Sequence, residues 1–327
     1  MLYIGDVRPF SIIRVVLLVF ALSNQVSEAR EYINEETRYE APHRRQCKAS
    51  SPPFFAGNRH PEGLPGITRG QEIRQLLPED PPGTHPYFIS LFDPDRNIPF
   101  YSAYKVTAQQ APFIGKYSRR DVKRRKFRNP PGVPGLNNAY KRAIQQEPLS
   151  RGHMNPVAIN TFDINFMKAT FTLTNTIPQY VASNSGPWQI FEAKIRRYAA
   201  GMCGGRARHG TLFLLTGSSE FSLANYLEEN GESFHSKVVL DGVNLAIPRA
   251  VWTAGCCVWK ESNDTRVQRA ESFAVISNNA RDQKWLNQTE MNVSELEKHL
   301  TSPGSPLVDL FPGDQLCRLP ENNIKLQ

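Results

Sequence analysis

The chain contains no Cys-x-x-Cys pair, and only 5 of its 327 residues are cysteine. Zinc sites are built largely from closely spaced pairs of that kind, so we do not expect the cysteines to bind a metal. The sequence has no internal repeat, and its 40% hydrophobic and 21% charged residues exclude a collagen-like chain, a coiled coil and a wholly disordered protein. After residue 29, no apolar run approaches the roughly 20 residues that a membrane-spanning helix needs. The composition therefore predicts a globular chain with a sizeable core and no stable membrane association.

The first 29 residues have the layout of a secretory signal peptide. Arg8 and Arg14 give a basic start, and residues 15–22 form an unbroken apolar run. Ser27 and Ala29 then place small side chains three and one positions before a cut that would precede Arg30. An N-terminal membrane anchor is the alternative, but the apolar run is too short to span a bilayer. We therefore expect cleavage, secretion and an extracellular protein.

The cysteines follow that segment, so secretion would expose them to an oxidising compartment. They are Cys47, Cys203, Cys256, Cys257 and Cys317. The count predicts two disulfides and one leftover thiol. Neighbouring residues on a strand point to opposite faces, and a bridge between them would be strained, so Cys256 and Cys257 are expected to take different partners. Three sequons, at Asn263, Asn287 and Asn292, are typical of a glycosylated secreted surface.

Positive charge exceeds negative charge, with 39 Lys and Arg against 31 Asp and Glu and a net charge of +8. This excess favours a polyanionic partner such as nucleic acid or a heparin-like sugar. The densest basic run, residues 116–128, contains a single acid, Asp121. Contact with nucleic-acid phosphates would explain the run and predicts binding that weakens steeply with salt. A solvated loop and a proprotein-convertase site at residues 125–128 are the alternatives. No base-reading motif is present, so binding without sequence preference is expected.

The order of elements predicts an α+β fold. Residues 30–84 are rich in proline and predict an irregular N-terminal extension, whereas residues 85–320 are expected to form the folded domain. Runs that favour β structure at 87–92 and 98–106 predict a hairpin, and the basic residues 115–142 predict a loop. Many strands with few helices favour a mainly antiparallel central sheet flanked by helices. Further strands are expected at residues 167–173, 211–215, 238–247, 250–259 and 272–276, and helices at residues 187–200 and 294–300.

The residues that could carry chemistry lie in the middle of the chain. An Arg-Gly-His tripeptide ends at His153, and Asn184 lies just before the helix expected at 187–200. Glu192 and Arg196 are four residues apart and therefore share one face of that helix. Amide and carboxylate oxygens suit Mg²⁺, and a nearby histidine could act as a general base on water. Each residue also has a structural interpretation, because Asn184 could cap the helix and Glu192 could form an ordinary surface pair with Arg196.

This pattern resembles the DNA/RNA non-specific endonucleases with a ββα-metal (His-Me finger) site. Within that family it is most similar to the secreted animal branch, the endonuclease domain-containing 1-like proteins. The resemblance covers residues 85–280 and is specific, because His, Asn, Trp and Glu occur in the family's order and at its separations. It implies the family's nuclease fold, with a mainly antiparallel central sheet and flanking helices. The matching segments are residues 101–106, 151–153, 172–175, 178–179, 184–192, 212–217 and 256–257.

The resemblance also implies a role for each residue. His153 matches the general base, Asn184 the single protein ligand of a Mg²⁺ ion that Mn²⁺ could replace, and Glu192 a carboxylate that holds metal-bound water. Arg196 and Arg151 match residues near the phosphate, where they would stabilise charge in the transition state. The implied substrate is DNA, with RNA as a second candidate, and the implied products carry 5′-phosphates. Further nucleic-acid contacts are expected in the preceding basic loop, at Arg119 or Arg120 and at Lys123, Arg124 and Arg125.

Two features depart from the family pattern. Ser150 stands where the family usually has Asp directly before Arg-Gly-His, and the missing charge predicts reduced activity. A cysteine common in the secreted branch is absent near residues 73–75, which would leave Cys47 without a partner. The leading hypothesis is a secreted, Mg²⁺-dependent endonuclease without sequence specificity. The alternatives are a catalytically weakened nucleic-acid or polyanion-binding protein on the same fold, and a heparin-like polysaccharide binder.

Overall fold

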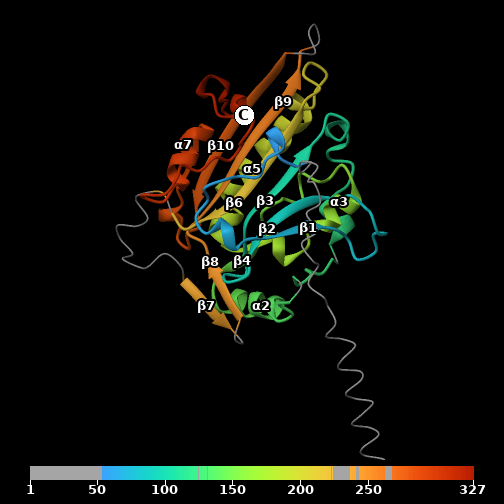
Figure 1. Cartoon of the computed structure of the whole chain (residues 1–327). Helices are drawn as coiled ribbons and strands as arrows, with labels where there is room; N and C mark the ends of the chain where they lie inside the picture. The colour runs from blue at the N-terminus through green and yellow to red at the C-terminus, as the bar shows by residue number, and fades with distance from the viewer. Residues whose placement is uncertain are drawn as a thin grey trace, which may run out of the picture. The chain divides into compact units, whose positions relative to one another are not determined.

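A seven-stranded antiparallel sheet forms the centre of the fold, in the order β1-β2-β3-β6-β9-β10-β11 (Figure 1). The computed structural model describes residues 54–327 except 124, 131, 222, 224–235, 241–242 and 262–266, and of residues 236–240 it describes the backbone alone. The strands of this sheet are β1 (Gln71–Gln75), β2 (Phe88–Asp93), β3 (Ile98–Val106), β6 (Thr211–Ser219), β9 (Ala250–Lys260), β10 (Gln268–Asn278) and β11 (Gln288–Met291).

Two small antiparallel sheets and a set of helices surround the central sheet. The small sheets pair β4 (Leu149–His153) with β5 (Thr176–Tyr180), and β7 (Ser236–Leu240) with β8 (Val243–Ile247). The helices are α2 (Leu136–Gln146), α3 (Ile164–Ala169), α4 (Val181–Asn184), α5 (Pro187–Tyr198) and α7 (Val293–Leu300). Short helical turns are η1 (Ala56–Asn58), η2 (Ile67–Arg69), η3 (Ala111–Phe113), η4 (Arg119–Val122), η5 (Leu173–Asn175), η6 (Ala199–Cys203), η8 (Gln283–Trp285), η9 (Gln315–Cys317) and η10 (Pro320–Asn322).

The central sheet is covered on both faces, because successive side chains of a strand point to opposite sides. Along β6, Leu212 and Leu214 belong to one hydrophobic cluster, whereas Leu215 belongs to a second. Helices α2 and α5 contribute buried side chains to the first cluster. Helix α7, which lies beside β10 (Figure 1), contributes to the second. The α+β fold with a mainly antiparallel central sheet, predicted from the sequence, is thus confirmed.

Helix α5 forms where the sequence predicts a helix, and it presents one apolar and one polar side. Pro187 occupies its first turn, where the missing backbone N–H costs nothing. Trp188, Phe191 and Ile195 are buried against the sheet. Glu192 and Arg196 are only partly buried. In chain order, the paired strands β4 and β5 precede α5, which gives a ββα arrangement.

Two disulfides tie peripheral segments to β9. Cys257 is bonded to Cys203, which ends the π-helical turn η6, and Cys256 is bonded to Cys317 near the C-terminus. The adjacent cysteines therefore take different partners on opposite faces of the sheet, as predicted. Cys47, the predicted leftover thiol, lies outside the described residues.

The prediction of an irregular segment at residues 30–84 is wrong at residues 71–75, which form a strand, whereas most of residues 54–70 and 76–84 lie in turns and irregular backbone. Gln71–Gln75 forms the edge strand β1 on β2, and Phe54 and Phe55 are buried in the second hydrophobic cluster. β1 was missed because its sequence, Gln-Glu-Ile-Arg-Gln, lacks β-favouring residues, and pairing with β2 overrides that low propensity. The domain boundaries and the predicted cleavage before Arg30 remain predictions.

Three further local predictions are wrong. Residues 167–173 were expected to form a strand, but Met167 to Ala169 end helix α3, because the Asp163 carboxylate accepts hydrogen bonds from the first-turn N–H groups of Asn165 and Phe166. The loop expected at 115–142 includes the start of α2. The strand expected at 238–247 is a hairpin, β7–β8. Among the described residues, no helix is both long and apolar enough to cross a membrane.

Candidate active site

A polar cleft of about 440 Å³ gathers the residues that the sequence singles out. It lies where β4, the end of α4, α5 and the start of η4 meet. Six candidate residues line this catalytic cleft, namely Arg119, Arg151, His153, Asn184, Glu192 and Arg196. Of the two arginines between which the sequence left the choice open, Arg119 lines the cleft and Arg120 does not.

The glycine of the Arg-Gly-His tripeptide has a steric explanation. Gly152 on β4 lies across from β5, and a Cβ placed there would be 2.1 Å from Oε1 of Gln179. Gln179 is 1% exposed and its Nε2 donates a hydrogen bond to the Ser183 hydroxyl. A side chain at position 152 would displace Gln179 and with it the start of α4. The glycine therefore lets the strand that carries His153 lie tightly against the segment that carries Asn184.

Asn184 is oriented by Ser150, the residue that departs from the family pattern. The Asn184 side-chain Nδ2 donates a hydrogen bond to the Ser150 Oγ at 2.9 Å, and the Ser150 hydroxyl donates to the backbone carbonyl of Gln179, also at 2.9 Å. Because the amide nitrogen is engaged, the Oδ1 of Asn184 is the atom left to accept or coordinate. Asn184 does not cap α5, whose N-cap residue is Gly186. The helix-cap interpretation of Asn184 is therefore wrong.

His153 lies in an aromatic wall of the cleft. Its ring centroid is 5.4 Å from that of Phe127 and 5.5 Å from that of Phe171. Burial, and then the positive charge of Arg119, lower the pKa of His153 to about 3. Its Nε2 is buried and has no hydrogen-bond partner among the described residues. The imidazole is therefore neutral at physiological pH and can accept a proton.

Glu192 is a carboxylate kept in the wall of the cleft without an ionic partner. Burial raises its pKa to about 8, against weaker opposite effects of the nearby Trp188 indole and the Arg119 guanidinium. The Trp188 Nε1 is close but forms no hydrogen bond of regular geometry with any described residue. No ion pair joins Glu192 to Arg196 within the described part of the chain, so the surface-pair interpretation is not supported. A cation would stabilise the charged form of this carboxylate.

The three arginines of the cleft are held to different degrees. The Nη2 of Arg151 donates to Oδ1 of Asn137 at 3.1 Å, and its guanidinium lies over the rings of Phe127 and Tyr140. Arg119 and Arg196 form no hydrogen bond or ion pair with the residues that the structure describes. Arg151 is thus a fixed cation, whereas Arg119 and Arg196 are available to an anionic ligand.

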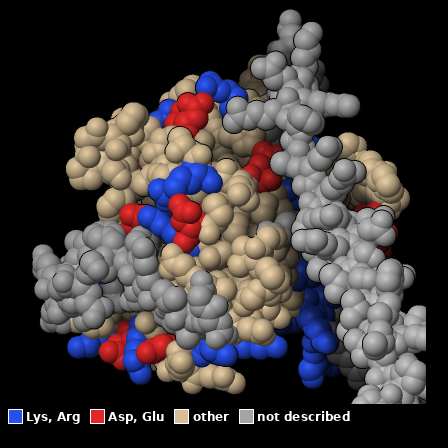
Figure 2. Space-filling model, turned by 60° about the horizontal axis from the view of Figure 1, so that its bottom comes forward, with Lys and Arg blue, Asp and Glu red and all other residues tan. Residues whose placement is uncertain are grey.

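The basic run next to the cleft is only partly available for nucleic acid. Arg120 and Lys123 are exposed, but Arg125 lies 3.4 Å from Glu79 and Arg128 donates to two backbone carbonyls. The side chains of Lys and Arg are interspersed with those of Asp and Glu on the face shown in Figure 2. Arg124 lies outside the described residues. Arg125 and Arg128 are therefore already engaged by other groups of the protein, whereas Arg120 and Lys123 are exposed.

The donor set of the cleft fits a metal held by few protein ligands. Within the described residues, no group of three or more His, Cys, Asp or Glu side chains could hold a metal ion. The cleft instead offers the Oδ1 of Asn184 and the carboxylate of Glu192, both oxygen donors that suit Mg²⁺ or Mn²⁺. Such a site suits an ion that keeps most of its water ligands or takes oxygens from a substrate.

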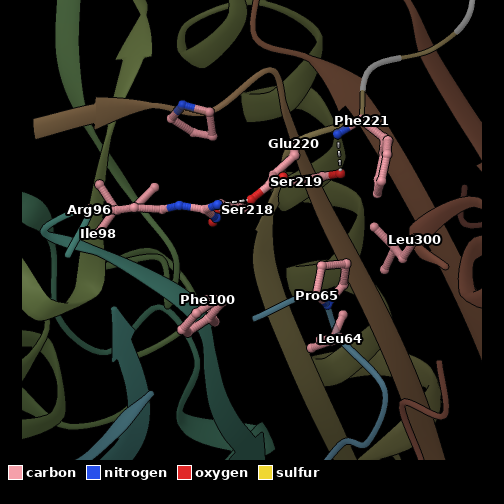
Figure 3. A pocket seen from close by; sticks show the side chains of 11 residues that line it. Leu64, Pro65, Arg96, Ile98, Phe100, Ser218, Ser219, Glu220, Phe221 and Leu300 are labelled. Atoms are coloured by element: carbon pink, nitrogen blue, oxygen red, sulfur yellow. Dashed lines mark hydrogen bonds and ion pairs between the residues drawn. The ribbon is translucent and has the colours of Figure 1, made fainter. Parts of the chain in front are cut away.

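A second, smaller pocket of about 30 Å³ gives a contrast (Figure 3). Its charged side chains, Arg96 and Glu220, point toward each other, and the rest of the lining is largely apolar and includes Phe100 and Leu300. Arg96 forms an ion pair with Glu220 and lies 3.7 Å from Asp93. These charges satisfy one another, so the small pocket is not a catalytic candidate.

The sequence did not reveal the residues that support the site from a distance. Asn137 fixes Arg151 from helix α2, which the sequence analysis missed. The buried Asn175 accepts hydrogen bonds from the Ser102 hydroxyl and the Asn155 backbone N–H, and so fixes the chain just after His153. Asn175 lies in a segment that matches the family pattern, but nothing in its local sequence indicates these contacts.

The chain is similar to known nucleases. A family model described as DNA/RNA non-specific endonuclease matches residues 77–309. The mitochondrial nuclease EXOG of Mus musculus is 26% identical over 179 residues, and that of Homo sapiens is 25% identical over 178 residues. Each alignment covers 54% of this chain and 45% of the relative. The chain thus spans less than half the length of these curated relatives.

The chain also matches a solved structure. It is described as "Crystal structure of the EndoG/EndoGI complex: Mechanism of EndoG inhibition". The match has a TM-score of 0.48 and 17% sequence identity, and it covers 68% of this chain and 83% of the other.

Proposed function

Because the chain belongs to the DNA/RNA non-specific endonuclease family, we propose that it hydrolyses phosphodiester bonds of DNA, and also of RNA, without sequence preference. The observation that carries this proposal is the catalytic cleft, in which one neutral histidine, one oriented amide oxygen, one unpaired carboxylate and three arginines converge.

In this proposal the arginines bind the substrate. Arg119 and Arg196 have no ionic partners among the described residues, so they would contact the oxygens of the scissile phosphate. Arg151, fixed by Asn137, would add a positive charge that does not need to reorganise during the reaction. The phosphate in turn would offset the positive charge of Arg119 beside His153 and raise the pKa of the imidazole toward the range of an effective base.

The proposed reaction is an in-line displacement at phosphorus. A ring nitrogen of His153 accepts a proton from a water molecule as the water oxygen forms a bond to phosphorus. The bond between phosphorus and the 3′ oxygen breaks, and that oxygen leaves with a proton from solvent. One water is consumed, and the products are a 5′-phosphate and a 3′-hydroxyl.

The family uses a divalent metal, and we propose that Asn184 Oδ1 holds Mg²⁺, for which Mn²⁺ can substitute. Glu192 would contact the ion through its water ligands. A bound ion would supply charge stabilisation for the phosphate and the leaving oxygen. Ser150 supports this proposal, because its hydroxyl gives the Asn184 amide a fixed orientation without a carboxylate. The same contact argues against the weakened binding protein that the sequence left as an alternative.

We also propose that the protein is secreted after cleavage before Arg30. The two disulfides support an oxidising compartment. Expression of the full chain in a secreting cell line, followed by N-terminal sequencing of protein from the medium, tests this. Residue 30 is the expected first residue, and retention of the intact chain inside the cell would overturn the proposal.

A plasmid-nicking assay on the secreted protein tests the activity. With Mg²⁺ we expect nicking, and with EDTA none. The substitution His153→Ala should lower the rate by about 10²- to 10⁴-fold, because it removes the proton acceptor. The matched control is His85→Ala, which changes an exposed histidine outside the cleft. A folded wild-type protein that binds plasmid but never nicks it, over a range of pH and metals, would instead establish the binding function.

A further inference from the structure

We propose that a pocket beside the catalytic cleft, walled by Tyr117, is a subsite for an unstacked nucleobase next to the scissile phosphate. The inference rests on the proposed function and adds the form of the substrate, namely single-stranded or locally opened nucleic acid.

The pocket, called here the Tyr117 pocket, is continuous with the catalytic cleft. It has a volume of about 330 Å³. Arg119, Val157, Ala158 and Arg196 line both spaces, so the two arginines that would hold the phosphate stand at the passage between them. A group that enters the Tyr117 pocket would therefore lie beside a phosphate bound in the cleft, as a nucleobase lies beside its own phosphate.

Tyr117 is held in place by the backbone on both sides. Its N–H donates to the Thr161 carbonyl at 2.9 Å, and the N–H of Gly115 donates to the Thr161 hydroxyl, also at 2.9 Å. Its side chain packs against a small hydrophobic cluster that contains Val157 and Phe171. An aromatic ring that is fixed before a ligand arrives loses little conformational entropy on binding.

The charges around the Tyr117 pocket suit an anionic, aromatic ligand. No carboxylate lines it. The nearby Asp121 is engaged by the backbone N–H and the hydroxyl of Ser118. The Nζ of Lys116 lies over the Tyr117 ring, 5.1 Å from its centroid, and adds a cation to those of Arg119 and Arg196. A base that stacks on this face of the ring would displace the exposed Lys116 side chain toward the phosphate backbone. An aromatic wall with surrounding cations is the arrangement that binds single-stranded nucleic acid, by stacking on the base and by charge on the backbone.

The chemistry of the pocket also accounts for a lack of sequence preference. Every base has a stacking face, so stacking on Tyr117 tolerates all four bases. A base inside a duplex must leave its stack to reach the ring, and the lost pairing and stacking oppose binding. The subsite therefore predicts faster cleavage of single-stranded than of duplex substrates.

Equilibrium binding in EDTA measures the subsite apart from catalysis. The probe is a fluorescein-labelled oligothymidylate of about 12 nucleotides. We expect Tyr117→Ala to weaken binding by about tenfold, and Tyr117→Phe and Tyr117→Trp to retain it, because they keep a stacking face. The matched control is Phe113→Ala, which removes an exposed aromatic ring that does not line the pocket. Unchanged binding by Tyr117→Ala would overturn the proposal.

A second experiment locates the base. A single abasic position is moved along a single-stranded oligonucleotide, and cleavage with Mg²⁺ is mapped at each bond. Wild-type protein should cut the bond next to the abasic position about tenfold more slowly than the same bond in the intact strand. Tyr117→Ala should lose this sensitivity, because it has no ring on which the base could stack.

The two experiments separate the subsite from the proposed function. Binding that depends on Tyr117 without any cleavage would leave the subsite and overturn the nuclease activity. Cleavage that is equal at intact and abasic positions would leave the nuclease and overturn the subsite. Absence of both binding and cleavage by folded protein would overturn both.

Discussion

Glu192 and Glu297 are both carboxylates whose pKa is raised by burial, yet they differ in what surrounds them. Glu297, on α7, is 1% exposed, and it accepts hydrogen bonds from the Leu310 backbone N–H at 2.8 Å and from Arg318 at 2.9 Å. Glu192, on α5, forms no ion pair with any described residue and faces the catalytic cleft. The partnered carboxylate stabilises the packing of α7 and the C-terminal segment. The one without a partner retains its capacity to bind a ligand.

The arginines of the two pockets differ in the same way. In the small pocket of Figure 3, Arg96 is paired with Glu220. In the catalytic cleft, Arg119 and Arg196 have no such partners among the described residues. Charged side chains that form ion pairs with each other contribute to folding. Charged side chains in a cleft that lack such a partner are those that a substrate can bind. Four predictions test this distinction.

The largest expected effect on stability comes from breaking the Glu297 pair. Arg318→Ala leaves a buried carboxylate without its cation, so the free energy of unfolding should fall by about 3–5 kcal/mol. Chemical denaturation of the folded protein measures this. Arg120→Ala is the control and should change stability little, because this arginine is exposed and its side chain forms no hydrogen bond or ion pair with the described residues. A loss below about 1 kcal/mol for Arg318→Ala would show that the pair contributes no more than a surface salt bridge.

The corresponding change at Glu192, the carboxylate without an ion pair among the described residues, should affect activity and not folding. Glu192→Gln removes the carboxylate that would hold metal-bound water, so the cleavage rate should fall by about 10- to 100-fold. The stability of the metal-free protein should be equal or higher, because no charge remains to be desolvated. Nicking rates and thermal unfolding are measured on the same preparations. Lost stability together with unchanged activity would reverse the roles assigned to the two glutamates.

The sequence predicted the elements that depend on local pattern. The β2–β3 hairpin and helix α5 follow from periodicity, and the different partners of Cys256 and Cys257 follow from strand geometry. Strand β1 and helix α3 were missed, because pairing with β2 and the cap by Asp163 outweigh residue propensity. Helix α2 was missed because it begins inside a basic, proline-rich region that has the composition of a loop.

The candidate site was predicted in its principal residues and not in their supports. Order and spacing singled out His153, Asn184 and Glu192, which line one cleft. The contacts of Ser150 with Asn184 and of Asn137 with Arg151 join residues 34 and 14 positions apart, and only the fold brings them together. A single sequence contains no signal for such pairs. The roles assigned to these residues stay predictions until the variants are measured.

The pH dependence of stability should separate the two titrating groups of the cleft. Glu192 has a folded-state pKa of about 8 against 4.5 for the free group, so the stability it contributes is present below 4.5 and is lost as pH rises through 8. His153 has a folded-state pKa of about 3 against 6.5, so its contribution is present above 6.5 and is lost as pH falls toward 3. Melting temperatures of the metal-free protein, recorded in EDTA over this pH range, measure both contributions.

Substitutions at Glu192 and His153 show which group causes the change in melting temperature at high pH and which causes the change at low pH. Glu192→Gln should gain over wild type as pH rises from 5 to 8, by a few degrees. His153→Ala should gain over wild type as pH falls below 6.5. Parallel profiles for wild type and both variants would show that neither group titrates with a shifted pKa in the folded protein.

The smallest expected effect concerns Ser150, because this residue orients the side-chain amide of Asn184, which is the proposed Mg²⁺ ligand. Ser150→Ala removes the acceptor for the Asn184 Nδ2, so the Mg²⁺ concentration for half-maximal activity should rise by about tenfold. Ser150→Asp keeps an acceptor and adds a negative charge near the cation, so that concentration should fall. The rate at saturating Mg²⁺ should change less than the Mg²⁺ requirement in both variants, because Ser150 acts through Asn184 and not on the phosphate. Equal Mg²⁺ dependence in wild type and Ser150→Ala would mean that the amide is held in place by the backbone of α4 alone, and that the missing family Asp has no substitute in this chain.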